Sequence, residues 1–395
     1  MKHPSLASHH ASWRWVFTAS LALGMAACGG GYGGDNPAPV TPTPTTTSTL
    51  NAALSGDQEP TPTVTGALGT GMLTLTMPSR ALSGSMAING MTATAAHVHL
   101  GEVGVNGAVI VSLAESTPGS GTWAVPAGTV LTEAQATAFS AGGLYFNAHS
   151  TENAGGEIRG QIGREVYAAQ MNASQEVPSN NSAATGVGFI SLDPVSKRFT
   201  ARMTLTGVTA TAAHIHTGNL GANGGVIFPL AETASGSNIW VAAADATMTD
   251  AQITAMKAGG LYFNAHSAAF GGGEIRGQIA RNVRFASMNA AQEVPTNAST
   301  ATGVGNLVID PATRAASGGI TLTGMTATMA HIHLGAPGAN GGVILGLTDA
   351  GGGRWNVPAN ATLTAEQLKA FKQGNLYFNA HSAAFPGGEI RGQIR

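Results

Sequence analysis

The chain has 395 residues, a formal net charge of -2 and only 10% charged residues. No basic patch or arginine-rich run occurs in it, which argues against a nucleic acid as its partner. The low charge, together with 55 glycines and abundant alanine and threonine, is more typical of β-rich extracellular domains than of helical cytoplasmic enzymes.

The first residues have the organisation of a signal peptide. Basic residues precede an apolar segment at 15–23, which is too short for a transmembrane helix of about 20 residues. Small residues then lead to Cys28, the only cysteine, and this arrangement resembles the lipobox of bacterial lipoproteins, although Met25 stands where leucine is usual. We therefore expect a signal peptide at 1–27 and lipidation of Cys28. Because Gly29 rather than aspartate follows the cysteine, we expect a lipid anchor in the bacterial cell envelope, at the outer membrane.

Residues 28–48 are rich in glycine and then in proline and threonine. Such a composition cannot form a core and predicts a flexible tether. Because Cys28 has no second cysteine to pair with, the domains that follow must be stabilised by packing, hydrogen bonding or bound metal.

The rest of the chain is a threefold tandem repeat. The motif His-X-His-X-Gly begins at His97, His214 and His331, and both steps are 117 residues. That period has the size of an ordinary domain. We therefore predict three domains, at residues 49–165, 166–282 and 283–395.

Within each unit the predicted elements follow one order. Segments that alternate apolar and polar residues, such as 71–76 and 199–205, predict half-buried strands. One tryptophan per unit is expected to anchor the core: Trp123, Trp240 and Trp355. One short helix per unit is expected between a threonine N-cap and a stopping glycine, at 132–142, 249–259 and 364–374. With a closing hairpin, each unit is predicted to be all-β: an antiparallel β-sandwich or Greek-key barrel of about eight short strands with one short helix.

Outside the leader, every histidine belongs to a set of three per unit. The sets are His97, His99 and His149; His214, His216 and His266; His331, His333 and His381. Side chains at i and i+2 of a strand share one face, so His97 and His99 should project together. On the opposite face, Ala96, Val98 and Leu100 can face a core.

The last two strands of each unit extend this polar face. By the same parity Tyr145, Asn147 and His149 share a face, and on the following strand Glu157 and Arg159 do so with a glutamine. If these strands are neighbours, each unit carries a polar cluster of three imidazoles, a carboxylate, a guanidinium and a carboxamide.

Three imidazoles that converge on one point would suit Zn(II) or Cu(II), with nitrogen ligands at about 2.0–2.1 Å. The candidate fourth ligands are Glu157, Glu274 and Glu389. We therefore hypothesise one copper or zinc ion per unit. In the alternative, the imidazoles hydrogen-bond the glycine-rich loops and Glu157 pairs with Arg159 along its strand.

No motif for nucleophilic catalysis or zincin proteolysis is visible, which favours a protein that is not an enzyme. The glycine-rich segments after the paired histidines, such as Gly104 to Gly107, predict a turn that needs positive φ. They do not predict a phosphate site, because no helix or Gly-Lys step follows them.

Four segments of each unit resemble the CHRD family, the domain named from chordin. As they stand in the second unit, they are Ala-Ala-His-Ile-His, Asn-Gly-Gly-Val-Ile, Gly-Gly-Leu-Tyr-Phe-Asn-Ala-His-Ser and Gly-Gly-Glu-Ile-Arg-Gly-Gln-Ile. The other two units differ from these at single positions. The resemblance implies a β-sandwich or barrel module of extracellular and bacterial secreted proteins, often repeated, with no settled activity. The cysteine-rich repeats with which chordin holds growth factors are absent here, so that activity is not carried over. A weaker likeness is to copper/zinc superoxide dismutase, whose barrel also presents His-X-His to copper, but its bridging histidine and disulfide have no counterpart.

Together these features predict a lipid-anchored bacterial envelope protein with three CHRD modules and a non-enzymatic role in binding or adhesion, with one metal ion per module. Its partners would be the membrane, through the anchor, and an extracellular or periplasmic ligand. The alternative is a periplasmic or surface protein that handles copper or zinc, or acts in redox chemistry, through its three-histidine clusters.

Overall fold

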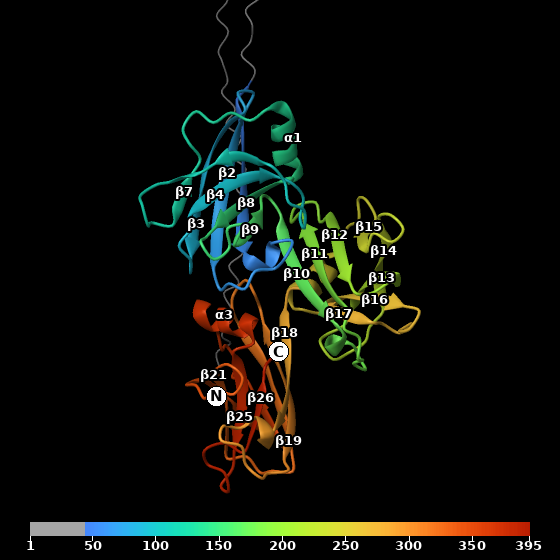
Figure 1. Cartoon of the computed structure of the whole chain (residues 1–395). Helices are drawn as coiled ribbons and strands as arrows, with labels where there is room; N and C mark the ends of the chain where they lie inside the picture. Colours follow the sequence, from blue (N-terminus) through green and yellow to red (C-terminus); the bar gives the residue numbers. More distant parts are fainter. Residues whose placement is uncertain (1–43) are drawn as a thin grey trace, which may run out of the picture.

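The structure, a computed structural model, describes residues 44–395. The predicted signal peptide, Cys28 and most of the predicted tether lie outside the described residues. The described chain forms three β domains in succession (Figure 1). The first strand begins at Thr46, within the segment predicted as tether.

Domain 1 contains nine strands and one α-helix. In chain order they are β1 (Thr46–Ser55), β2 (Leu68–Met77), β3 (Ala81–Asn89), β4 (Ala95–Leu100), β5 (Val109–Ser112), β6 (Ala114–Glu115), β7 (Thr122–Ala124), α1 (Glu133–Ala141), β8 (Leu144–His149) and β9 (Ile158–Gln161).

Domain 2 contains eight strands and one α-helix. They are β10 (Glu165–Asn172), β11 (Thr185–Leu192), β12 (Phe199–Thr206), β13 (Ala210–Thr217), β14 (Val226–Glu232), β15 (Ile239–Ala242), α2 (Asp250–Lys257), β16 (Leu261–Ser267) and β17 (Ile275–Gln278).

Domain 3 again contains nine strands and one α-helix. They are β18 (Asn282–Asn289), β19 (Thr302–Ile309), β20 (Ala316–Thr323), β21 (Met329–Leu334), β22 (Val343–Gly346), β23 (Thr348–Gly351), β24 (Arg354–Asn356), α3 (Ala365–Gln373), β25 (Leu376–His381) and β26 (Ile390–Gln393). A short 3-10 turn follows the first strand of every domain, at Gly56–Gln58, Ala173–Gln175 and Ala290–Gln292.

The three domains share one antiparallel, barrel-like topology. Domain 2 is a closed barrel in the order β10-β11-β12-β15-β14-β13-β16-β17. In domain 1 the sheet runs β5-β4-β8-β9-β1-β2-β3-β7-β6, and its two end strands are separated only by Leu113, whose amide donates to the carbonyl of Ala96 at 2.9 Å. Leu347 makes the same bond to Ala330 in domain 3, at 2.8 Å. The all-β prediction with one short helix per unit is therefore confirmed, and of the two predicted architectures the sheets are barrel-like, with domain 2 a closed barrel.

Alternation along the strands builds the core of each barrel. Strand β12 alternates buried and less buried positions as the pattern predicted, and all three predicted anchor tryptophans are buried. Ala96 and Val98 face the core of domain 1, but Leu100 does not, because it ends its strand and is 41% exposed. The core expectation for Leu100 is therefore wrong.

The helices begin and end where their capping residues predicted. Thr132 accepts a hydrogen bond from the amide of Gln135, while the amide of Thr132 donates to the Gln135 side chain, and the other two helices have the same capping box. Gly142 and Gly374 end their helices in the left-handed conformation, whereas Ala258 caps α2 and Gly259 follows it with positive φ.

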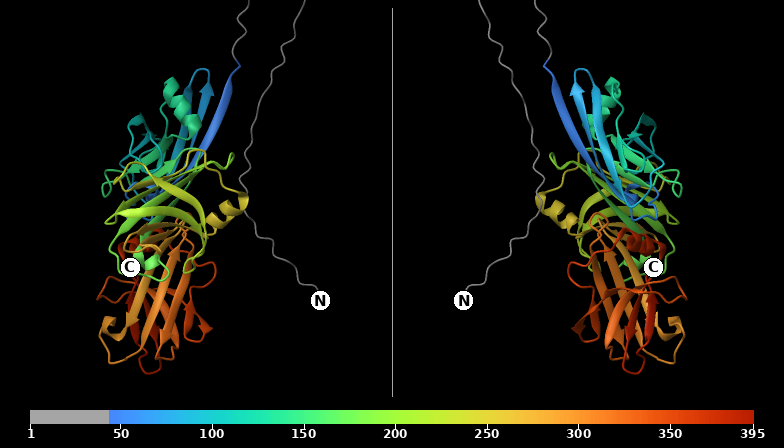
Figure 2. Two further views of the ribbon diagram at one scale, coloured as in Figure 1. Left: turned by 90° about the vertical axis from the view of Figure 1, so that its right-hand side faces the viewer. Right: turned by 90° about the vertical axis from the view of Figure 1, so that its left-hand side faces the viewer.

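Domains 1 and 3 touch although domain 2 separates them in the sequence. They lie end to end, with α3 at their junction and domain 2 beside them (Figures 1 and 2). The buried ammonium of Lys372 lies 3.0 Å from the carboxylate of Asp57, and Asn282 donates to the same carboxylate at 3.2 Å. A Cβ on Gly66 would come within 1.9 Å of the carbonyl oxygen of Ala365, so this close approach requires glycine.

No helix of residues 44–395 has the length and apolar character needed to cross a membrane.

Candidate metal centre

Strand register places the three histidines of each domain on one face. In domain 1, His97 and His99 of β4 lie opposite Asn147 and Tyr145 of β8, and Ala95 lies opposite His149. This is the face turned away from the barrel core. A register shift between Val98 and His99 in the pairing with β5 marks an irregularity in the ladder at the second histidine, and it recurs in the other two domains.

The three imidazoles of each domain converge. In every set, one ring nitrogen from each histidine lies within 4.8 Å of those of the other two. The Nδ1 atom of His97 is 3.0 Å from Nε2 of His149, and the corresponding distance from His331 to His381 is 3.2 Å. The predicted three-histidine clusters are therefore confirmed, and all nine predicted histidines belong to them.

Backbone carbonyls determine which nitrogen two of the three rings in each set turn toward the cluster. His99 Nδ1 is 2.9 Å from the carbonyl oxygen of Gly107, and His149 Nδ1 is 3.0 Å from that of Ala154. A carbonyl can only accept, so each Nδ1 carries the proton and each Nε2 presents a lone pair to the cluster. A metal-binding histidine commonly donates its other ring N–H in this way. The same contacts recur from His216, His266, His333 and His381 to the carbonyls of Gly224, Gly271, Gly341 and Pro386.

In domain 2 the converging nitrogens have no hydrogen-bond partner at all. His214 Nδ1, His216 Nε2 and His266 Nε2 are all buried and unpaired. Leaving one such polar group buried and unsatisfied costs about 1–3 kcal/mol. Three of them in one cluster could hold a ligand that accepts three lone pairs, such as a metal ion.

An aromatic column supports the second histidine. The ring of Tyr145 stacks on that of His99 with centroids 4.8 Å apart and an interplanar angle of 11°, and the guanidinium carbon of Arg159 lies 3.4 Å from the Tyr145 ring centroid. The amide of Gly107 donates to the Tyr145 hydroxyl at 3.0 Å, while the carbonyl of Gly107 accepts from His99. Tyrosine and arginine repeat this column in domains 2 and 3.

Only glycine fits at the centre of this clamp. A Cβ on Gly107 would lie 1.6 Å from the carbonyl oxygen of Leu100, and the equivalent atoms in the other domains would be as close. The positive φ predicted for the turn falls on Gly104 and its counterparts Gly221 and Gly338. The turn thus places the carbonyl of Gly107 where it accepts the hydrogen bond from His99.

The electrostatics of the site favour neutral imidazoles. Burial lowers the pKa of His97, and the neighbouring His149 lowers it further. Burial also lowers the pKa of His99, against the hydrogen bond to Gly107, which raises it. Burial lowers the pKa of five more cluster residues: His214, His216, His331, His333 and His381. Neutral imidazole is the form that binds a metal ion.

The carboxylates that were predicted as fourth ligands lie in a different cluster. Glu157 accepts hydrogen bonds from Thr65, at 2.6 Å, and from Ser150. Glu274 and Glu389 accept in the same way from Ser182 and Ser299, each at 2.6 Å. These oxygens are engaged by hydroxyl groups, and the converging sets contain histidines alone.

Arg159 does not pair with Glu157 either. The ion pairs of the described residues do not include these two side chains. The buried guanidinium of Arg159 instead donates to the carbonyls of Glu102, at 2.6 Å, and Val105, at 2.8 Å. The predicted pairing of Glu157 with Arg159 along the strand is therefore wrong, whereas the other part of that alternative, imidazoles that hydrogen-bond the glycine-rich loops, is confirmed. The arginine holds the loop that carries Gly107.

Sequence reasoning missed the role of a second buried carboxylate, Glu59. Its side chain accepts a hydrogen bond from Asn147 at 2.6 Å. Burial raises the pKa of Glu59 to about 7, although Asn147 and the charge of Arg159 both lower it. The Gln-Glu step that opens each unit was its signal, since Glu176 and Glu293 repeat the contact with Asn264 and Asn379.

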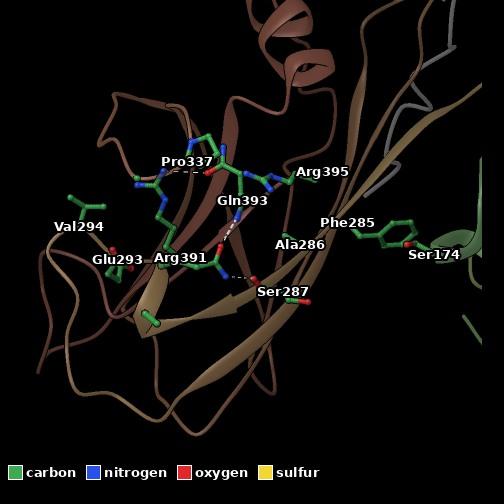
Figure 3. A pocket seen from close by; sticks show the side chains of 13 residues that line it. Ser174, Phe285, Ala286, Ser287, Glu293, Val294, Pro337, Arg391, Gln393 and Arg395 are labelled. Atoms are coloured by element: carbon green, nitrogen blue, oxygen red, sulfur yellow. Dashed lines mark hydrogen bonds between the residues drawn. The ribbon is translucent and has the colours of Figure 1, made fainter. Parts of the chain in front are cut away.

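A surface hollow of domain 3 lies beside Arg391 and contains none of the nine histidines. On its wall, the amide of Gln393 donates to the side chain of Gln292 at 3.2 Å, and that side chain donates to the carbonyl of Ser287 at 2.7 Å (Figure 3). These bonds tie β26 to the 3-10 turn after β18. The polar groups on this wall of the hollow are thus bonded to one another and hold the fold together.

Comparison with known proteins identifies the repeat. The model of one family, the CHRD domain, matches the chain three times, over residues 50–162, 167–279 and 284–394. A search among curated proteins found no match. The three matches cover most of the chain, and each contains one complete histidine set. The chain therefore belongs to the CHRD domain family, as three tandem copies.

Proposed function

We propose that each CHRD domain of this protein binds one copper or zinc ion through its three histidines, and that the protein is a metal-holding protein of the bacterial envelope. The observation that carries the proposal is in domain 2, where three buried ring nitrogens face one another without a hydrogen-bond partner. In domains 1 and 3 one pair of the corresponding nitrogens is at hydrogen-bond distance, whereas in domain 2 all three lack a partner. Because unpaired buried polar groups are costly, the set of domain 2 favours a bound ion over a purely structural cluster.

The spacing of the nitrogens supports the proposal. Nitrogens bound at about 2.0–2.1 Å to one tetrahedral ion lie roughly 3.3 Å from each other. The nitrogens of His97 and His149 are 3.0 Å apart, and those of His331 and His381 are 3.2 Å apart; both are hydrogen-bond distances and are also close to the spacing that a shared ion requires. With the glutamates engaged by hydroxyl groups, the fourth position is left to water or to a small ligand.

The envelope location is a separate part of the proposal and rests on the sequence alone. Lipidation of Cys28 would tether the three domains to the outer membrane, where they could meet metal ions or an extracellular or periplasmic ligand. Replacing Cys28 by serine should then release the protein from membranes into the soluble fraction. Unchanged membrane association of Cys28→Ser would contradict the anchor without affecting the metal proposal.

Metal analysis of the purified chain tests the metal sites. Chain loaded with Cu(II) or Zn(II) and freed of excess ion should retain about three ions, one per three-histidine set. The triple variant His99→Ala, His216→Ala, His333→Ala should retain none tightly, because each set then has two ligands.

A matched control replaces the buried carboxylates instead. Glu157→Gln, Glu274→Gln and Glu389→Gln leave the histidines intact, so the triple glutamine variant should retain all three ions. Circular dichroism of both variants checks that the domains remain folded. Failure of the folded native chain to bind either ion tightly, or equal binding by the folded histidine variant, would overturn the proposal.

A further inference from the structure

The site of domain 3 differs from the other two at one position of the ligand face. Met329, His331 and His333 occupy alternate positions of β21 and therefore share one face. The corresponding positions in domains 1 and 2 hold Ala95 and Ala212. Domain 3 alone thus adds a thioether to the face that carries its imidazoles.

Register brings Met329 next to the third histidine of its set. In the pairing of β21 with β25, Met329 lies directly opposite His381. Side chains of directly opposite residues begin about 4.5–5.5 Å apart and lie on the same face. The thioether of a methionine has three rotatable bonds with which to approach its neighbours.

Packing does not account for this methionine. Met329 is 45% exposed and lies outside the apolar core of domain 3. An exposed, unpacked apolar side chain beside three convergent imidazoles is available to a ligand of the same site. Thioether sulfur is a soft donor that favours Cu(I), whereas a site of imidazoles alone suits Zn(II) and Cu(II).

We propose that Met329 supplies an additional thioether ligand to the histidine set of domain 3 and makes that site selective for Cu(I). The proposal rests on the metal binding proposed above and extends it, because it divides the three sites into two classes. Domains 1 and 2 hold an ion by imidazoles alone, and domain 3 holds cuprous copper by imidazoles and sulfur.

The test uses full-length chains that keep one site each. In the first chain, alanine replaces His97, His99, His214 and His216, so that only the site of domain 3 remains. Its affinity for Cu(I), supplied without oxygen, is measured by competition with a chromophoric Cu(I) chelator, and its affinity for Zn(II) by competition with a zinc indicator. Adding Met329→Ala should weaken Cu(I) binding about tenfold or more and leave Zn(II) binding nearly unchanged.

The matched gain-of-function variant is made in domain 1. In the second chain, alanine replaces His214, His216, His331 and His333, and Ala95→Met is then added. Cu(I) affinity should rise, and X-ray absorption at the copper edge should show a sulfur neighbour that the second chain lacks without Ala95→Met.

The outcomes separate the two proposals. If the one-site chains bind metal but Met329→Ala changes Cu(I) and Zn(II) affinities equally or not at all, the thioether proposal fails and the metal proposal stands. If the one-site chains are folded and bind neither ion, both fail.

Discussion

Each domain has two sets of polar side chains on or beside neighbouring strands, which are β4, β8 and β9 in domain 1, and the two sets differ in how their atoms are paired. In domain 1 the carboxylate of Glu157 is bonded to hydroxyl groups and the guanidinium of Arg159 to carbonyls. In the histidine set, by contrast, the buried Nε2 of His99 has no partner, and in domain 2 all three converging nitrogens lack one. A paired cluster stabilises the fold, and an unpaired one stores a cost that a ligand can remove. Residue type alone does not distinguish the two sets, because the carboxylate of one and the imidazoles of the other can both bind a metal ion.

The largest effect is expected from a substitution that disrupts the paired cluster. Arg159→Met should destabilise domain 1 by about 3–5 kcal/mol, because it removes the buried guanidinium that bonds two loop carbonyls and leaves the buried carboxylate of Glu59 without a nearby positive charge. Urea unfolding is followed by the fluorescence of Trp123, in a chain whose other four tryptophans, Trp13, Trp15, Trp240 and Trp355, are replaced by phenylalanine, so that the signal comes from this domain.

The histidine set supplies the control for that measurement. In metal-free protein, His97→Ala should change the free energy of unfolding of domain 1 by less than about 1 kcal/mol, because a half-buried ring with few good partners is removed. A loss as large as that of Arg159→Met would mean that the histidine set is a structural cluster after all.

The second prediction sharpens the comparison through pH. The folded-state pKa of Glu59 is about 7, above its ordinary value of 4.5. A carboxyl group with a raised folded pKa contributes most stability below its unfolded pKa, and this contribution is lost as pH rises from about 4.5 to 7. Glu59→Gln, which mimics the protonated form, should therefore gain about 3 kcal/mol over the native chain between pH 4 and pH 8.

That gain is read as the difference between variant and native chain at each pH, with the same Trp123 fluorescence. Histidines with lowered pKa values titrate in the same range in both chains and cancel in the difference. A difference that does not change with pH would show that the pKa of Glu59 is the same in the folded and the unfolded chain.

A smaller effect than those of Arg159 and Glu59 is expected at Tyr145, whose ring lies between His99 and Arg159. Tyr145→Phe keeps the ring stacked between His99 and Arg159 but removes the hydroxyl that accepts from Gly107. We expect the free energy of unfolding of the metal-free domain to change by about 1 kcal/mol, and the metal affinity to fall about tenfold.

Tyr145→Leu, which also removes the stacking, should lower metal affinity further and shift the visible spectrum of bound Cu(II). If Tyr145→Phe and Tyr145→Leu both leave affinity and spectrum as in the native chain, the tyrosine does not position His99.

Much of the fold and the three-histidine sets could be predicted from the sequence, because the patterns that indicate them are local. Strand alternation places His97 and His99 on one face whatever the rest of the domain does, and a threonine N-cap with a glutamine three residues later marks each helix start. Threefold repetition made the third histidine recognisable.

The partners of those side chains were decided by the tertiary structure. Which nitrogen His99 presents depends on the carbonyl of Gly107 in a loop, and the engagement of Glu157 depends on Thr65, which is far away in the sequence. The buried pair of Asp57 and Lys372 joins two domains that are not consecutive. Parity fixes the side of a strand, but a hydrogen bond depends on where the packed barrels and loops bring the other atom, and no local pattern encodes that position.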